Sequence, residues 1–141
     1  MKGRKPKLRV LEGGASPDRC PGPPSWLSKH AAGEWRRAAP DLHRRGLLTR
    51  DTFATLESHC IAVGTVRECE ELLQRDGRII QGEKGPVQHP AFRMQAAAMR
   101  EARLLAAELG LTPHRRIKPT GGEVGDPPPA SAEDPWEGML S

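Results

Sequence analysis

The chain has 141 residues and a formal net charge of +4; 28% of its residues are charged and 4% are aromatic. No apolar run approaches the roughly 18 residues that span a bilayer, and the basic N-terminus lacks the apolar block of a signal peptide. A membrane-spanning protein is excluded on this basis, and we expect a cytoplasmic, helix-rich protein. Because its foldable part of about 90 residues buries its core only moderately well, we also expect self-association.

The first segment, residues 1–24, is basic at first and then rich in Gly and Pro, with neither helical nor strand periodicity. It therefore predicts a flexible basic arm. Flexible cations neutralise DNA phosphates with little sequence preference, although a basic tail without a specific role is the alternative. The DNA-binding candidates in the arm are Lys2, Arg4, Lys5, Lys7 and Arg9.

A first amphipathic helix is predicted over residues 29–45, with Ser28 as its N-cap and Trp26 or Leu27 packed back on its first turn. Pro40 predicts a kink or a restart of the helix, and Gly46 predicts its end. The polar face carries further DNA-binding candidates, for which a solvated helix face is the alternative. They are Arg36, Arg37, Arg44 and Arg45.

The second helix should begin after Thr49 and end at Gly77. Its apolar positions move to another face beyond Gly64, so either the helix bends there or it is contacted on two sides. We favour contact on two sides, by the chain's own core and by a neighbouring subunit. Cys60 and Cys69 read as small core residues of this helix rather than as partners in a disulfide.

Two short strands around a turn are predicted over residues 78–89, and a third helix follows over residues 91–109. The pattern is that of a mainly α protein. Its three-helix core should span residues 25–118 and include a small β-hairpin between helices 2 and 3. The apolar seam of the third helix should comprise Ala91, Met94, Ala98, Ala102, Leu105 and Leu109. After Gly110, a short basic turn offers further DNA-binding candidates, Arg115, Arg116 and Lys118.

Residues 119–141 hold five acids and no base, and their composition predicts a disordered tail. Its apolar residues are spaced for docking into a groove on a partner, with an inert solubilising tail as the alternative. These residues are Trp136, Met139 and Leu140.

Catalytic signals are weak throughout the chain. The acids of residues 68–71 splay around one helix, as in a solvated face, instead of converging on metal ions. His89 has no nucleophile or acid beside it in sequence and should cap the junction between strand and helix. Because no metal-ligand spacing and no phosphate-binding Walker loop occur, we predict no metal, no cofactor and no ATPase activity.

Three linked segments carry a family resemblance: PPSWLS…EWRRAAPDL…GLLT in residues 23–49, VQHPAF in residues 87–92 and LAAELGLTP in residues 105–113. In this order and spacing they resemble the small terminase subunit of tailed phages, in the P27-like family. The resemblance implies a non-enzymatic, ring-forming subunit of the genome-packaging motor. It would bind double-stranded viral DNA and recruit and regulate the large terminase subunit, an ATPase and nuclease.

By this resemblance the arm and the helix arginines hold DNA, helices 2 and 3 and the hairpin build the ring, and the acidic tail contacts the large subunit. The protein would act in the host cytoplasm and be absent from the mature virion. A small dimeric DNA-binding transcriptional regulator is the competing hypothesis, and a phage nuclease ranks third.

Overall fold

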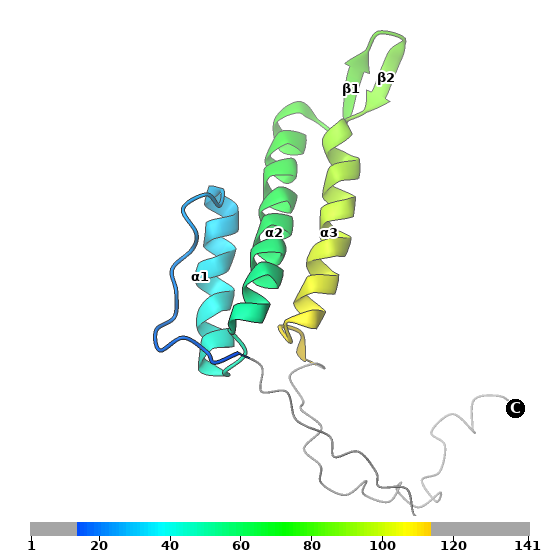
Figure 1. Cartoon of the computed structure of the whole chain (residues 1–141). Helices are drawn as coiled ribbons and strands as arrows, with labels where there is room; N and C mark the ends of the chain where they lie inside the picture. The colour runs from blue at the N-terminus through cyan, green and yellow to red at the C-terminus, as the bar shows by residue number, and fades with distance from the viewer. Residues whose placement is uncertain (1–13, 114–141) are drawn as a thin grey trace, which may run out of the picture.

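The computed structural model describes residues 14–113. Three helices, α1 (Lys29–Arg44), α2 (Arg50–Asp76) and α3 (Pro90–Glu108), lie side by side with α2 in the middle (Figure 1). Strands β1 (Ile79–Gly82) and β2 (Gly85–Gln88) form an antiparallel hairpin between α2 and α3. The hairpin projects beyond the ends of these two helices (Figure 1). The predicted mainly α fold, with three helices and this hairpin, is confirmed.

Helix α1 begins at its predicted cap, where the Ser28 side chain accepts a hydrogen bond from the Ala31 N–H. Leu27 packs against the core and Trp26 is 61% exposed, so Leu27 provides the apolar contact at this end. We predicted a kink or a restart at Pro40, and the helix runs through Pro40 to Arg44 without a restart. Pro40 itself is exposed, and the buried face on either side of it, formed by Ala39 and Leu42, holds the helix together despite the missing donor.

Glycines end α1 and α3 in the same way. Gly46 (φ 67°) and Gly110 (φ 71°) adopt the left-handed conformation that suits glycine, as predicted. After α1 the Leu47 N–H donates to the Leu42 carbonyl oxygen, and after α3 the Leu111 N–H donates to that of Ala106. These bonds satisfy carbonyl groups that the helix end would leave unpaired, and they turn the chain sharply.

Helix α2 is continuous and is covered on two sides by helices of its own chain. Leu56 and Cys60 belong to the cluster shared with α1, whereas Cys69 and Leu73 cluster with Ala91 of α3. The expectation of contact on two sides is therefore correct, but α3 takes the place that we gave to a neighbouring subunit. All four α2 side chains are buried, including both cysteines that we assigned to the core.

The junction between the hairpin and α3 is capped by His89, as predicted. Its Nδ1 accepts a hydrogen bond from the Ala91 N–H at 3.0 Å, and its Nε2 lies 3.2 Å from Asp76 Oδ2. In the predicted seam of α3, Ala91, Ala98 and Leu109 are buried, but Met94 is 58% exposed. Gln95 is buried in its stead, because its amide donates to Glu70 Oε2 of α2 at 2.7 Å.

Residues 14–24 lie along α1 instead of forming part of a flexible arm (Figure 1). The Ser16 hydroxyl donates to the Leu48 carbonyl oxygen at 2.9 Å, and Trp35 Nε1 donates to that of Pro21 at 2.9 Å. His43 Nε2 is 2.7 Å from the carbonyl oxygen of Pro17. The predicted arm is therefore too long: side chains of α1 hold its second half. Its first half, residues 1–13, lies outside the described residues.

Candidate nucleic-acid interface

The outward face of α1 carries a row of cations. Helical spacing places Lys29, Arg36, Arg37 and Arg44 on one side, opposite the buried face that contains Trp35 and Ala38. At a rise of 1.5 Å per residue the row is about 22 Å long. Because the apolar side of α1 packs against the core, the opposite side, which carries these cations, faces solvent.

Between α1 and α2 the surface is hollowed, with a volume of about 460 Å³. The lining combines four exposed cations with the apolar side chain of Val63, and it opens at Gly33, where an added Cβ would have no neighbour within 4 Å. Arg67 of α2 brings a cation from the second helix, so the hollow is basic on both sides. The lining residues are Lys29, His30, Gly33, Glu34, Arg36, Arg37, Val63 and Arg67.

Glu34 is the single carboxylate among these lining residues, and it is already engaged. Arg37 donates to both of its oxygens, from Nε to Oε2 at 2.8 Å and from Nη2 to Oε1, and His59 Nε2 lies 3.0 Å from Oε1. Burial raises the pKa of the Glu34 carboxyl, but the hydrogen bonds from His59 and Arg37 outweigh it and lower this pKa to about 2. Glu34 therefore stays ionised and neutralises Arg37 alone.

His59 lies behind the hollow and is 3% exposed. Its Nδ1 is 3.1 Å from the Ala102 carbonyl oxygen of α3, while its Nε2 faces Glu34 of α1. Each ring nitrogen therefore lies within hydrogen-bond distance of an oxygen atom, one on α3 and one on α1. His59 thus links α2 to both α1 and α3, and it contacts Glu34 in the lining of the hollow.

A family model described as phage terminase, small subunit, matches residues 31–124, which is more than half of the chain. The chain belongs to the phage terminase small subunit family. No curated protein and no solved structure matches it. Small terminase subunits are generally the non-catalytic component of their complex. The matched range begins inside α1 and contains Arg36, Arg37 and Arg67 of the hollow.

In this small terminase subunit the two other arginines predicted on the first helix, Arg44 and Arg45, lie at its C-terminal end. Arg44 pairs with Asp41 at 2.6 Å and keeps its side chain exposed. Arg45 also pairs with Asp41, at 3.0 Å, and donates to the Gly110 carbonyl oxygen at 3.0 Å. Arg45 therefore ties the end of α1 to the end of α3, and its guanidinium is committed to the fold.

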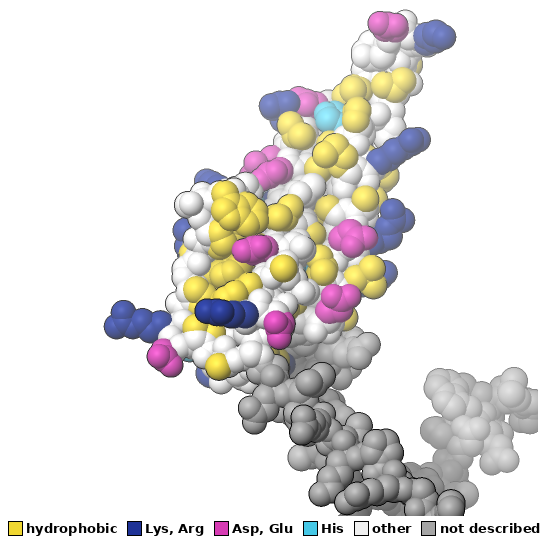
Figure 2. Space-filling model, in the orientation of Figure 1, with side chains coloured by type: hydrophobic (Ala, Val, Ile, Leu, Met, Phe, Trp, Pro, Cys, Tyr) yellow, Lys and Arg dark blue, Asp and Glu magenta, His cyan; other side chains and the backbone are white. Residues whose placement is uncertain are grey.

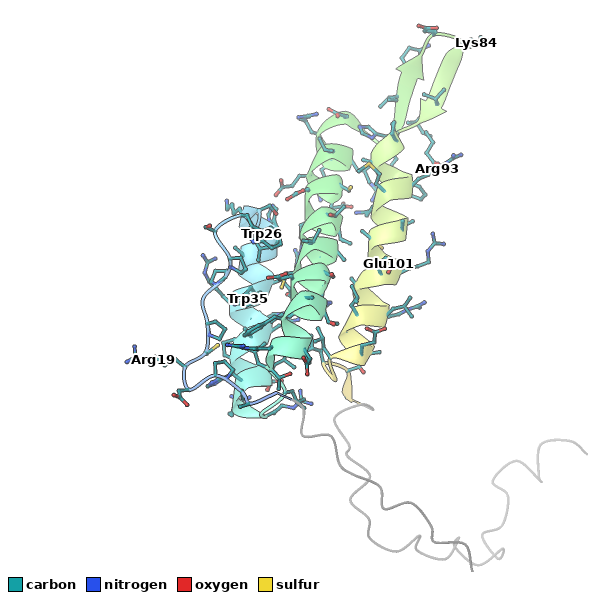
Figure 3. The ribbon with its side chains drawn as sticks, in the orientation of Figure 1. Arg19, Trp26, Trp35, Lys84, Arg93 and Glu101 are labelled. Atoms are coloured by element: carbon teal, nitrogen blue, oxygen red, sulfur yellow. The ribbon has the colours of Figure 1, made fainter. Side chains whose placement is uncertain are left out.

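A second basic surface lies on the outer side of α3. Arg93 points away from the other helices (Figure 3), and basic side chains, coloured dark blue, follow the outer edge of α3 in Figure 2. Helical spacing places Arg100 and Arg103, which are also exposed, on the same side as Arg93. Since α2 separates α1 from α3, the two basic surfaces are distinct and can be tested separately.

Within residues 14–113, no three His, Cys, Asp or Glu side chains come together as a metal site. Burial raises the pKa of the Cys60 thiol to about 12, so it remains protonated and is not a nucleophile at neutral pH. Of the acids in residues 68–71, Glu70 accepts from Gln95 and helps to join α2 to α3. None of the helices in this range is long and apolar enough for a membrane crossing.

The structure brings Arg36 and Arg37 together with two cations that we had not predicted, Lys29 and Arg67. Sequence analysis also missed Glu34 and His59, although each occupies an apolar stripe, three positions after Ala31 and Leu56 respectively. A charged residue on such a stripe indicates a buried partner. The remaining predicted sites lie outside the described residues: Lys2, Arg4, Lys5, Lys7, Arg9, Arg115, Arg116, Lys118, Trp136, Met139 and Leu140.

Proposed function

We propose that this chain is a DNA-recognition and regulatory subunit of a tailed-phage packaging motor, of the P27-like type. It would bind double-stranded viral DNA, recruit and regulate the large terminase ATPase and nuclease, and act in the host cytoplasm without entering the mature virion. The family match and the basic hollow between α1 and α2 support this proposal together. The hollow is the observation that carries the DNA-binding part.

DNA would lie across the hollow, with phosphates facing Lys29, Arg36 and Arg67. Phosphate contacts of this kind give affinity and position rather than sequence preference. The arm, through Lys5, Lys7 and the other cations of residues 1–9, would add contacts beside the hollow, and residues 115–118 would supply further cations.

Assembly into a homo-oligomeric ring would multiply these weak contacts into avidity. The large apolar side chains exposed on the hairpin and α3 support self-association, because contact with another subunit would remove them from water. They are Ile79, Val87, Phe92, Met94, Met99 and Leu104. The large subunit would be contacted by the tail, through Trp136, Met139 and Leu140.

The test is binding of the full chain to fluorescent double-stranded DNA, with Arg36→Ala/Arg67→Ala as the variant. Arg93→Ala/Arg100→Ala is the matched control, because it also removes two exposed arginines, from the outer side of α3. We expect the first variant to weaken binding at least tenfold and to reduce its salt dependence, and the control to change little. Equal losses would refute the hollow as the interface.

Native mass spectrometry of the same samples tests the assembly. A ring supports the packaging function, whereas a dimer that binds one operator sequence tightly would support a transcriptional regulator instead. DNA binding and assembly are thus measured separately on the same full chain, so each part of the proposal has its own test.

A further inference from the structure

The hollow between α1 and α2 holds positive charge that the fold does not neutralise. Lys29, Arg36 and Arg67 are exposed, and none of them has an ion-pair partner among residues 14–113. Glu34 is committed to Arg37 and His59, so it does not neutralise them. Three unpaired cations around an open hollow attract any nearby segment of opposite charge.

The chain itself contains such a segment after α3. Between residues 119 and 141 there are five carboxylates and no Lys, Arg or His. This segment also contains Trp136, which is next to Glu137 and two residues after Asp134. The carboxylates are Glu123, Asp126, Glu133, Asp134 and Glu137.

Charge also distinguishes the basic hollow from the apolar surface around Trp26 and Ile61. Glu68 lines the depression beside Trp26, and Glu101 lines the depression beside Ile61. Asp and Glu side chains lie among the hydrophobic ones over this face of α2 and α3 (Figure 2). An acidic segment is repelled there, whereas the basic hollow offers it complementary charge.

The distance fits as well. Because Arg45 donates to the Gly110 carbonyl oxygen, the tail leaves the fold beside the C-terminal end of α1. From there the hollow extends along α1 between Arg36 and Lys29, about 14 to 24 Å away at 1.5 Å per residue. The 24 residues from 113 to 137 can span up to about 80 Å when fully extended, which exceeds this distance. The acids therefore reach the hollow of their own chain.

We propose that residues 123–137 occupy the basic hollow of their own chain when DNA is absent, and that they compete there with DNA phosphates. The contact itself needs only the hollow and the tail, whereas the competition rests on the proposed DNA-binding function. If another protein bound the tail, the hollow would be free for DNA. Binding of that partner would therefore strengthen DNA binding.

Disulfide trapping in the full chain tests the contact without DNA. One cysteine replaces Gly33, where a Cβ has open space, and the other is introduced as Ser131→Cys, both in a Cys20→Ser background. Cys60 and Cys69 are buried and do not interfere. The control has Lys84→Cys at the hairpin in place of Gly33→Cys. We expect an intrachain disulfide to form about tenfold faster with position 33 than with position 84.

A second variant replaces the five carboxylates by Gln or Asn and should remove this difference. The same substitutions, in the chain with its natural cysteines, should tighten DNA binding several-fold at low salt. Equal trapping rates at positions 33 and 84, trapping unaffected by loss of the five charges, or a disulfide that joins two chains would overturn the proposal. Trapping without DNA binding would leave the tail contact standing and refute the DNA-binding function instead.

Discussion

Glu34 of α1 and His59 of α2 face each other in the interior, with Oε1 and Nε2 3.0 Å apart and both residues at most 9% exposed. His59 reaches on to the Ala102 carbonyl oxygen of α3. A series of polar contacts, from Glu34 through His59 to the Ala102 carbonyl, thus crosses a core built mainly of Ala, Leu, Cys and Trp. Each of its groups is paired, which is the condition under which buried polar groups are tolerated.

Glu34→Gln should destabilise the protein by about 2 kcal/mol or more, because it leaves His59 and Arg37 without a charged acceptor while it keeps the side-chain shape. Urea unfolding at pH 7 measures this loss. Glu71→Gln is the control, since Glu71 is exposed and, within residues 14–113, pairs only with the partly exposed His30; the expected change is within about 0.5 kcal/mol. Equal changes in the two variants would show that the buried contacts of Glu34 contribute no more to stability than the exposed Glu71–His30 pair.

The same pair predicts a dependence on pH. The pKa of Glu34 is lowered from 4.5 to about 2, so its stabilising effect is complete above pH 4.5 and is lost as the pH falls toward 2. The difference in unfolding free energy between the natural protein and Glu34→Gln should therefore shrink across this window. Asp76, whose pKa is also lowered to about 2, titrates in both proteins and cancels in the difference. A difference that stays constant from pH 7 to pH 2 would contradict this assignment.

Periodicity and end signals predicted most of the fold. Ser28, Gly46, Gly77 and Gly110 mark helix ends in both the sequence and the structure, because caps and left-handed glycines act locally. At Pro40 a local rule, the loss of one backbone hydrogen bond, predicted a kink or a restart, and the helix does not restart. The buried face around Pro40 is a property of the packed protein, which a local rule does not include.

The candidate site was less predictable than the fold. The periodicity of one helix placed Arg36 and Arg37 on a single face, but Arg67 joins them from α2, and no local pattern shows which helices pack together. The same holds for Glu34 and His59, which are 25 residues apart in sequence. Their pairing depends on the crossing of α1 and α2, so only the assembled core reveals it.

That crossing depends on Gly64. A Cβ at this position would lie 2.9 Å from the Ala31 backbone nitrogen and 3.0 Å from the Ala31 Cβ, so the helices would have to separate. Gly64→Ala should therefore destabilise by about 1 to 3 kcal/mol, despite the better helix propensity of alanine. Gly33→Ala is the matched control and should stabilise by about 0.5 to 1 kcal/mol, because its Cβ meets nothing. Thermal unfolding of both variants decides the sign, and stabilisation by Gly64→Ala would refute the tight crossing.

Trp35 joins α1, α2 and the segment before α1. Its ring stacks on Phe53 with a centroid distance of 6.5 Å, and its Nε1 donates to the Pro21 carbonyl oxygen. Because the side chain is 3% exposed, Trp35→Ala should cost about 3 to 5 kcal/mol. Trp26→Ala, at an exposed tryptophan, should change stability little. Urea midpoints measure both, and a near-neutral Trp35→Ala would mean that the ring is not buried in solution.

The arm provides the last prediction, on DNA binding rather than stability. Replacing Lys5, Lys7 and Arg9 by alanine should weaken binding to double-stranded DNA and flatten the plot of log affinity against log salt. The slope should fall by about 0.9 for each phosphate that these cations no longer neutralise. Stability should not change, since the core is built within residues 14–113. Fluorescence anisotropy at several salt concentrations measures the slope, and urea unfolding provides the control. An unchanged slope would leave the hollow between α1 and α2 as the sole proposed DNA-binding surface of residues 1–113.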